Sequence, residues 1–192
     1  MNKRIIELVE RIKAIELELE AELYEARDNL NYRLINHKIH FEKSVRQQHR
    51  RFKINLFRYA LFPQWRHVVT APFIYAVFPA LLLVDLLASL YHAVCFPLLG
   101  IPKVKRGDYF IFDHQHLAYL NLLEKFNCAY CSYGNGLVSY LKEIIGRTEQ
   151  YWCPIKHARR VLAAHSRYGS FVEYGDAESF RRDLEIIRKF KD

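Results

Sequence analysis

The sequence predicts a mainly α protein made of a long N-terminal coiled-coil helix, a membrane-embedded helical segment and a small α+β domain stapled by a metal. Three observations carry this prediction. Residues 3–60 hold an apolar stripe without Pro or Gly, Val68 to Ile101 form an apolar run with one charge, and four residues near the C-terminus have metal-ligand spacing. We place the segments at residues 1–60, 61–106 and 107–192.

The charge of the chain is concentrated in one stretch. The net charge is +8, and residues 31–67 carry nine Lys/Arg against the single acid Glu42. Such a stretch favours an anionic partner, either nucleic acid or phospholipid headgroups. Because it leads directly into the apolar run, we expect a phospholipid membrane as the partner and consider nucleic acid unlikely.

The N-terminal stripe predicts one long helix. Its spacing settles into an eleven-residue period, seen in Ile12, Leu23, Leu34 and Val45. This period is typical of a straight or slightly right-handed coiled coil. A lone helix would leave the stripe in water, so we expect a homo-oligomer or a partner helix through residues 5–56. Packing on the protein's own C-terminal domain is the alternative.

The apolar run indicates a membrane segment. Its 34 residues would span about 50 Å as a helix, too long for one crossing of a core of about 30 Å and too short for two. Basic residues flank both ends, which places the N- and C-terminal parts on the cytoplasmic side. A re-entrant hairpin broken near Pro79, or an embedded helix pair, fits these flanks. A single transmembrane span over 80–99 is the alternative.

One carboxylate interrupts the apolar run. A charge in this setting is costly and therefore a functional candidate, so Asp85 is singled out. It could instead cap a helix break or pair with His92.

Four residues near the C-terminus predict a metal site. They form a C-x2-C pair and a C-x3-H pair: Cys128, Cys131, Cys153 and His157. A turn at residues 134–136 would complete a zinc knuckle, and Pro154 would open a helix from Cys153 to about His165. The ligand spacing resembles that of treble-clef zinc modules. Zinc is expected more than iron, and four protein ligands leave no open position for catalysis. A redox C-x2-C couple and free core cysteines are the alternatives.

The other expected elements of this domain are short. We expect strands at 109–112 and 171–174, helices at 117–126 and 137–145, and a final helix capped by Asp176 that ends near Phe190.

The candidate catalytic residues follow the first of these strands. They are Asp113, His114 and His116, placed where a strand end commonly carries ligands. The alternative is that Asp113 caps the next helix while the histidines face solvent. Glu143 and Glu149 are further acid–base candidates, although no spacing ties them to the histidines.

We expect a membrane-anchored, oligomeric, zinc-binding scaffold or interaction protein that presents a cytosolic domain. The alternative is a membrane-bound metalloenzyme or redox protein that uses the Cys/His cluster with residues 113–116. The closed site favours a protein that is not an enzyme.

Overall fold

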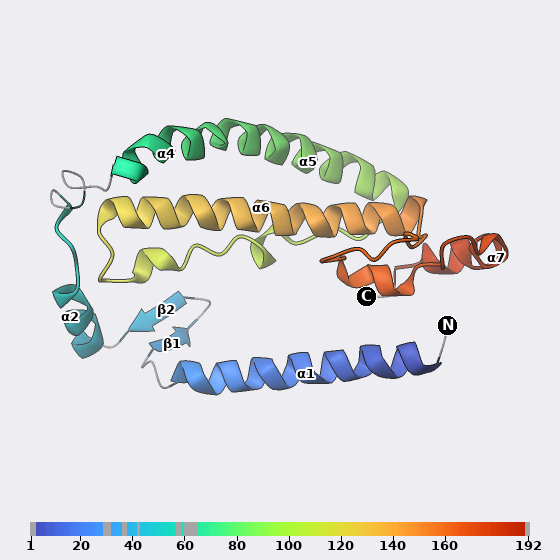
Figure 1. The fold of residues 1–192 in the computed structure, drawn as a ribbon, viewed down its shortest axis with the longest axis horizontal. Helices are drawn as coiled ribbons and strands as arrows, with labels where there is room; N and C mark the ends of the chain where they lie inside the picture. Colours follow the sequence, from blue (N-terminus) through green and yellow to red (C-terminus); the bar gives the residue numbers. More distant parts are fainter. Residues whose placement is uncertain are drawn as a thin grey trace. The chain divides into compact units, whose positions relative to one another are not determined.

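The computed structural model is mainly helical, as predicted (Figure 1). It describes residues 3–28, 32–35, 38–41, 43–56, 59 and 65–190. The chain divides into two compact units, which are described separately. The first contains residues 1–59 and 113–125, and the second contains residues 60–112 and 126–192.

The first unit begins with helix α1, Lys3–Asp28. A two-stranded antiparallel hairpin follows, with β1 at Tyr32–Ile35, β2 at Lys38–Phe41 and Tyr32 opposite Phe41. Helix α2 then covers Lys43–Arg51.

The expected single helix over residues 3–60 is therefore wrong. Asn29 and Asn31 are poor helix formers, and the tyrosine, isoleucine and phenylalanine residues that follow them favour strands. The eleven-residue pattern is consequently divided between a helix, a hairpin and a second helix, with Leu34 in β1 and Val45 in α2.

The second unit contains a long apolar rod formed by α4, Trp65–Ala76, and α5, Phe78–Leu99. Over Trp65–Leu99 it is long and apolar enough to cross a membrane by length and composition, with a mean hydropathy of 2.2 and none of its apolar window buried. Pro79 lacks an N–H and lies where α4 gives way to α5. Gly100 ends α5 in the left-handed conformation, at φ +67°.

Helix α6, Leu122–Trp152, lies parallel to this rod (Figure 1). The rod and α6 run in the same direction. Near the start of both, the Tyr75 hydroxyl donates to Asn127, and further along both, the His92 ring contacts Tyr140. The connecting segment runs back along α6. Near its start the Pro102 carbonyl accepts from Arg147. This segment includes the 3-10 turn η1, Arg106–Asp108.

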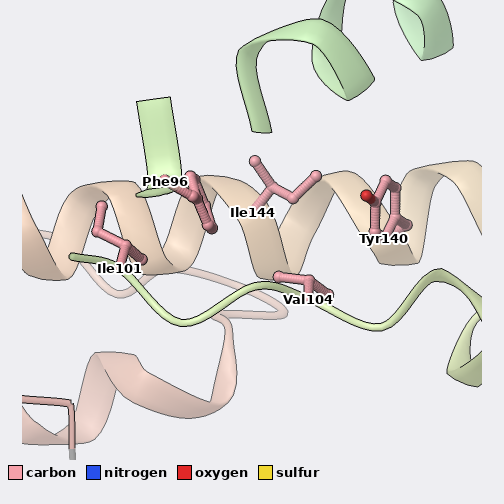
Figure 2. Packing of buried hydrophobic residues seen from close by; sticks show 5 residues of the cluster. All are labelled: Phe96, Ile101, Val104, Tyr140 and Ile144. Atoms are coloured by element: carbon pink, nitrogen blue, oxygen red, sulfur yellow. The ribbon is translucent and has the colours of Figure 1, made fainter. Parts of the chain in front are cut away.

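The core lies where α5, the connecting segment and α6 meet. Figure 2 shows its five members, which are at most 5% exposed: Phe96, Ile101, Val104, Tyr140 and Ile144. The core thus fixes the C-terminal end of the apolar rod against the middle of α6.

The expected turn at residues 134–136 is wrong, since α6 continues through it. Gly136 is needed for packing: a Cβ there would lie 2.8 Å from the carbonyl oxygen of Tyr109. Gly146 is packed likewise, because a Cβ would lie 2.8 Å from the His165 ring. Tertiary packing therefore uses Gly136, which a local reading assigns to a turn.

The helix expected to begin at Cys153 is also wrong. The residue before a proline disfavours the α conformation, and α6 ends at Trp152, just before Cys153 and Pro154. The following segment is irregular as far as η3, Ser166–Ser170. The expected strand at 171–174 is reduced to one parallel bridge between Ile155 and Val172.

Of the other elements expected in this region, some are confirmed and others are wrong. The strand at 109–112 is absent from the described residues, where η1 and irregular chain replace it. The helix expected at 137–145 is part of α6, which begins at Leu122. Of the helix expected at 117–126, only residues 122–126 are helical, and residues 117–121 are irregular. The final helix is confirmed as α7, Ala177–Ile187, with Asp176 accepting from the Ser179 N–H at 3.0 Å.

Candidate functional site

The structure does not bring the four predicted zinc ligands together. Cys128 and Cys131 lie within α6, whereas Cys153 follows its last residue. At 1.5 Å per residue, the helix separates Cys131 from Cys153 by about 33 Å. All four cysteines of the chain are free thiols.

His157 lies beyond α6, with its backbone N–H bonded to the Tyr168 hydroxyl at 2.6 Å. Among the described residues, no three His, Cys, Asp or Glu side chains are grouped as a metal site requires. Zinc stays a prediction from the sequence. Metal analysis of the purified protein and of its Cys128→Ser and His157→Ala variants tests it.

The candidate catalytic residues lie in the first unit, around the 3-10 turn η2, His114–His116. Asp113 precedes this turn but makes no capping hydrogen bond with its side chain. Its carboxylate lies 3.6 Å from Nδ1 of His114, and both side chains are about half exposed. This contact is a surface pair, and His116 stays a candidate from the sequence alone.

The polar group with the most developed geometry surrounds Asp85 in the second unit. Arg106 donates to both carboxylate oxygens at 2.6 Å, forming a bidentate pair. Tyr133 donates to Oδ2 at 2.7 Å and Ser89 to Oδ1 at 3.2 Å. Asp85 therefore pairs with Arg106 on the connecting segment and not with His92.

These donors satisfy the carboxylate of Asp85 fully. Each oxygen accepts two hydrogen bonds, which is its ordinary capacity. The Asp85 side chain is 13% exposed, so partners are needed to offset its desolvation. No lone pair is left for a metal or a substrate proton, and the group acts as a latch between α5, α6 and the connecting segment.

Aromatic rings enclose the other side of the latch. The Arg106 guanidinium lies 4.0 Å from the ring centroid of Phe110 and 5.6 Å from that of Tyr140. Such cation–π contacts add to the electrostatic stabilisation of the arginine. The hydrogen bond to Asp85 raises the pKa of Arg106. Burial, and then the hydrogen bond to Asp85, raise the pKa of Tyr133 to about 12, so the phenol stays neutral and keeps donating.

A second polar contact joins the same three elements about two turns further along the rod. The backbone N–H of Val104 donates to Nε2 of His92 at 2.9 Å. A neutral imidazole that accepts at Nε2 carries its proton on Nδ1, which lies 3.2 Å from the Tyr140 hydroxyl. His92 is buried and therefore has a satisfied structural role.

A third polar cluster joins α6 to the C-terminal segment. Glu143 accepts from Arg147 at 2.7 Å and from Arg167 at 3.2 Å, and Arg167 also donates to Gln150. This places the acid–base candidate Glu143 in a structural ion pair. The spacing of Glu143 and Arg147, four residues apart, is the one sequence signal for this cluster.

The other acid–base candidate, Glu149, pairs with His165 at 3.0 Å. Nδ1 of His165 is buried beside Gly146 and has no hydrogen-bond partner among the residues that the structure describes. The sequence reading found neither this pair nor Arg106 as the partner of Asp85, because both depend on the path of the irregular segments.

Comparison of the chain with family models, with curated proteins and with solved structures found no match.

Proposed function

We propose that this chain is a membrane-anchored, self-associating scaffold protein whose C-terminal part is presented on the cytoplasmic side of a bilayer. In this proposal the rod Trp65–Leu99 is the anchor, and it lies in the plane of the membrane. Helix α6 and the connecting segment then lie on the aqueous side. Helix α1 joins copies of the chain.

The observation that carries the proposal is an aliphatic stripe on the outer face of α5, which we name the outer stripe. Its members recur every three or four residues and are about half exposed or more: Leu83, Leu87, Leu90, Val94 and Leu98. The opposite face packs on α6 through Asp85, His92 and Phe96. A continuous exposed stripe of this kind marks an interaction site. Because the stripe consists of leucine and valine without polar side chains, lipid is the partner that it favours.

Charges beside α5 support an in-plane position over a crossing. Tyr91 of α5 and Thr148 of α6 share a hydrogen bond of 2.9 Å, so the second half of α5 lies level with Lys142, Glu143 and Arg147. A perpendicular crossing would carry these charges into hydrocarbon, at about 2.5–3.5 kcal/mol for each cation at the centre. It would also carry in the non-helical connecting segment, whose backbone groups need partners.

Basic and aromatic side chains at the ends of the rod fit the headgroup layer. Arg66 lies near its start, Lys103 and Lys105 follow its end, and all three are exposed. Trp65 is 71% exposed at the first residue of the rod, as expected of an interfacial anchor. Positive charge at both ends favours the cytoplasmic side for both.

Helix α1 supports self-association. Five of its described apolar side chains form a stripe, which we name the α1 stripe, and each is about half exposed: Leu8, Ile12, Ile15, Leu19 and Leu23. The remaining surface of α1 is rich in glutamate. An isolated helix gains little stability without burying such a stripe, so a second copy is its expected partner.

Flotation with vesicles of phosphatidylcholine and phosphatidylserine tests the proposal. The intact chain is expected to float with the vesicles, and Leu87→Lys is expected to lower the bound fraction at least tenfold because it places an ammonium in the acyl region. Leu17→Lys on α1 is the matched control, since Leu17 is 67% exposed and lies off the α1 stripe. A chain that stays at the bottom of the gradient contradicts the anchor.

A further inference from the structure

A pocket of about 490 Å³ lies in the second unit, between the bend of the apolar rod and the first part of α6. Its volume falls within the range of small-molecule sites, roughly 300–1,000 Å³. Aromatic rings form its walls, chiefly those of Tyr75, Phe78, Phe112, Phe126, Tyr130 and Tyr133, and Ala129 completes the lining.

The walls of this pocket present an apolar surface to a ligand, because the three phenolic hydroxyls already donate hydrogen bonds within the protein. Tyr75 donates to Oδ1 of Asn127 at 2.5 Å, and Tyr130 donates to the carbonyl oxygen of Ile74 at 2.6 Å. Tyr133 donates to Asp85, whose charge Arg106 balances. A polar or charged ligand would lose its hydration there without finding a new partner, so the pocket suits a hydrocarbon.

Ring packing holds the walls in place without a ligand. Tyr75 and Tyr130 meet edge to face with centroids 5.4 Å apart, and Phe78 meets Tyr133 in the same way at 5.7 Å. The pocket is therefore formed in advance. Its edge remains open, since Phe126 is 59% exposed.

The pocket adjoins the apolar rod that is proposed as the membrane anchor. Phe78 lines it at the first residue of α5, and Phe73 and Val77 beside it are exposed by 75% and 50%. A chain entering from the acyl region past Phe73 and Val77 would contact apolar side chains before it reached the rings.

We infer that this pocket binds one acyl chain of a bilayer phospholipid, an inference that rests on the proposed membrane anchor. Three observations favour this ligand: the walls are aromatic, their hydroxyls already have hydrogen-bond partners, and the pocket adjoins the exposed apolar rod. The anchor would thereby hold a single lipid as well as a bilayer surface.

A phospholipid with a diazirine on its acyl chain tests the inference in vesicles. After illumination, mass spectrometry locates adducts in the intact chain. Adducts are expected both on the outer stripe of α5 and on residues 126–133 of α6. Ala129→Trp fills the pocket and is expected to lower the adducts on residues 126–133 at least fivefold while the outer stripe keeps its adducts. Val138→Trp, at an exposed position of α6 outside the pocket, is the matched control and is expected to leave both sets unchanged.

The two sets of adducts separate the two proposals. Adducts confined to the outer stripe overturn the pocket inference and leave the anchor standing. Unchanged labelling of residues 126–133 in Ala129→Trp also overturns it, because those adducts would then arise at the open surface. The absence of adducts from both regions contradicts the anchor and the pocket together.

Discussion

Arg106 holds both carboxylate oxygens of Asp85 at 2.6 Å, although the two residues are 21 positions apart in the chain. The pair fastens the connecting segment to the middle of an otherwise apolar helix. Asp85 is 13% exposed and Arg106 is 43% exposed, so the carboxylate is the member that depends on its partner.

Arg106→Gln is therefore expected to destabilise the protein by about 1–3 kcal/mol, less than for a fully buried pair because water reaches the guanidinium. Asp85→Leu combined with Arg106→Met is expected to recover much of that loss, since no unpaired charge remains. Denaturant unfolding of the wild type, Asp85→Leu, Arg106→Met and the double variant in detergent micelles gives the coupling energy. Additive effects of the two single substitutions would show that the pair is not formed.

Two nearby glycines test the continuity of α6. Alanine favours a helix over glycine by about 1 kcal/mol, but a Cβ at Gly136 would lie 2.8 Å from the Tyr109 carbonyl oxygen. Overpacking in Gly136→Ala is expected to cost about 1–3 kcal/mol, and the higher helix propensity of alanine offsets part of this cost. Gly134→Ala meets only Leu81, at 3.7 Å, and is expected to be neutral or stabilising. Thermal unfolding followed by circular dichroism measures both, and a loss of stability in both variants would favour a turn at this place.

The phenol of Tyr133 predicts an alkaline transition. Its pKa is raised to about 12 in the folded protein, by burial and by the hydrogen bond to Asp85. An unfolded tyrosine ionises near pH 10, so the contribution of Tyr133 to the free energy of unfolding is fully present below that pH. It is lost between pH about 10 and about 12, where the unfolded state alone releases the proton. Tyr133→Phe is expected to flatten the fall in unfolding free energy across this window. An unchanged slope would contradict the raised pKa of Tyr133 in the folded protein.

The α1 stripe predicts that one substitution changes the state of association. Leu19→Asp places a charge on the stripe and is expected to raise the dissociation constant at least tenfold, because a buried leucine contributes about 1.5–3 kcal/mol. Leu17→Asp adds the same charge at an exposed position off the stripe and is expected to have little effect. Sedimentation equilibrium in matched detergent measures both. A wild-type chain that is monomeric at all concentrations would remove this part of the proposal.

Sequence reasoning identified the elements whose signal is local. The apolar rod follows from composition, and the cap of α7 follows from Asp176 after a glycine. Both depend on neighbours within a few residues, so a single sequence carries enough information. The mainly α class follows for the same reason.

The errors have a common physical origin in contacts between distant segments. Gly134, Gly136 and Pro154 read as signals for a turn and a helix start, whereas α6 runs through the glycines and ends before the proline. The close approach of Tyr109 to Gly136 decides this, and the two positions are 27 residues apart in the sequence. The spacing of the four predicted metal ligands likewise does not bring them together, because α6 separates the first pair from the second.

Of the candidate residues, Asp85 was selected correctly as unusual, but its partner was not found. Arg106 reads as one of several basic residues flanking the membrane segment. Its role becomes visible only when the irregular connecting segment returns along α5. Irregular chain carries no periodicity from which such a path could be predicted.

The depth of the outer stripe in a bilayer tests the central claim most directly. Nitroxide labels placed singly at positions 83, 87, 90, 94 and 98 of the full chain, in a background with its natural cysteines replaced by serine, report depth through their relative accessibility to oxygen and to a water-soluble nickel complex. An in-plane anchor predicts high oxygen accessibility and nearly equal depth at all five positions. A depth that changes steadily by about 1.5 Å per residue would show a crossing helix, and high nickel accessibility at every position would show that the stripe does not enter the membrane.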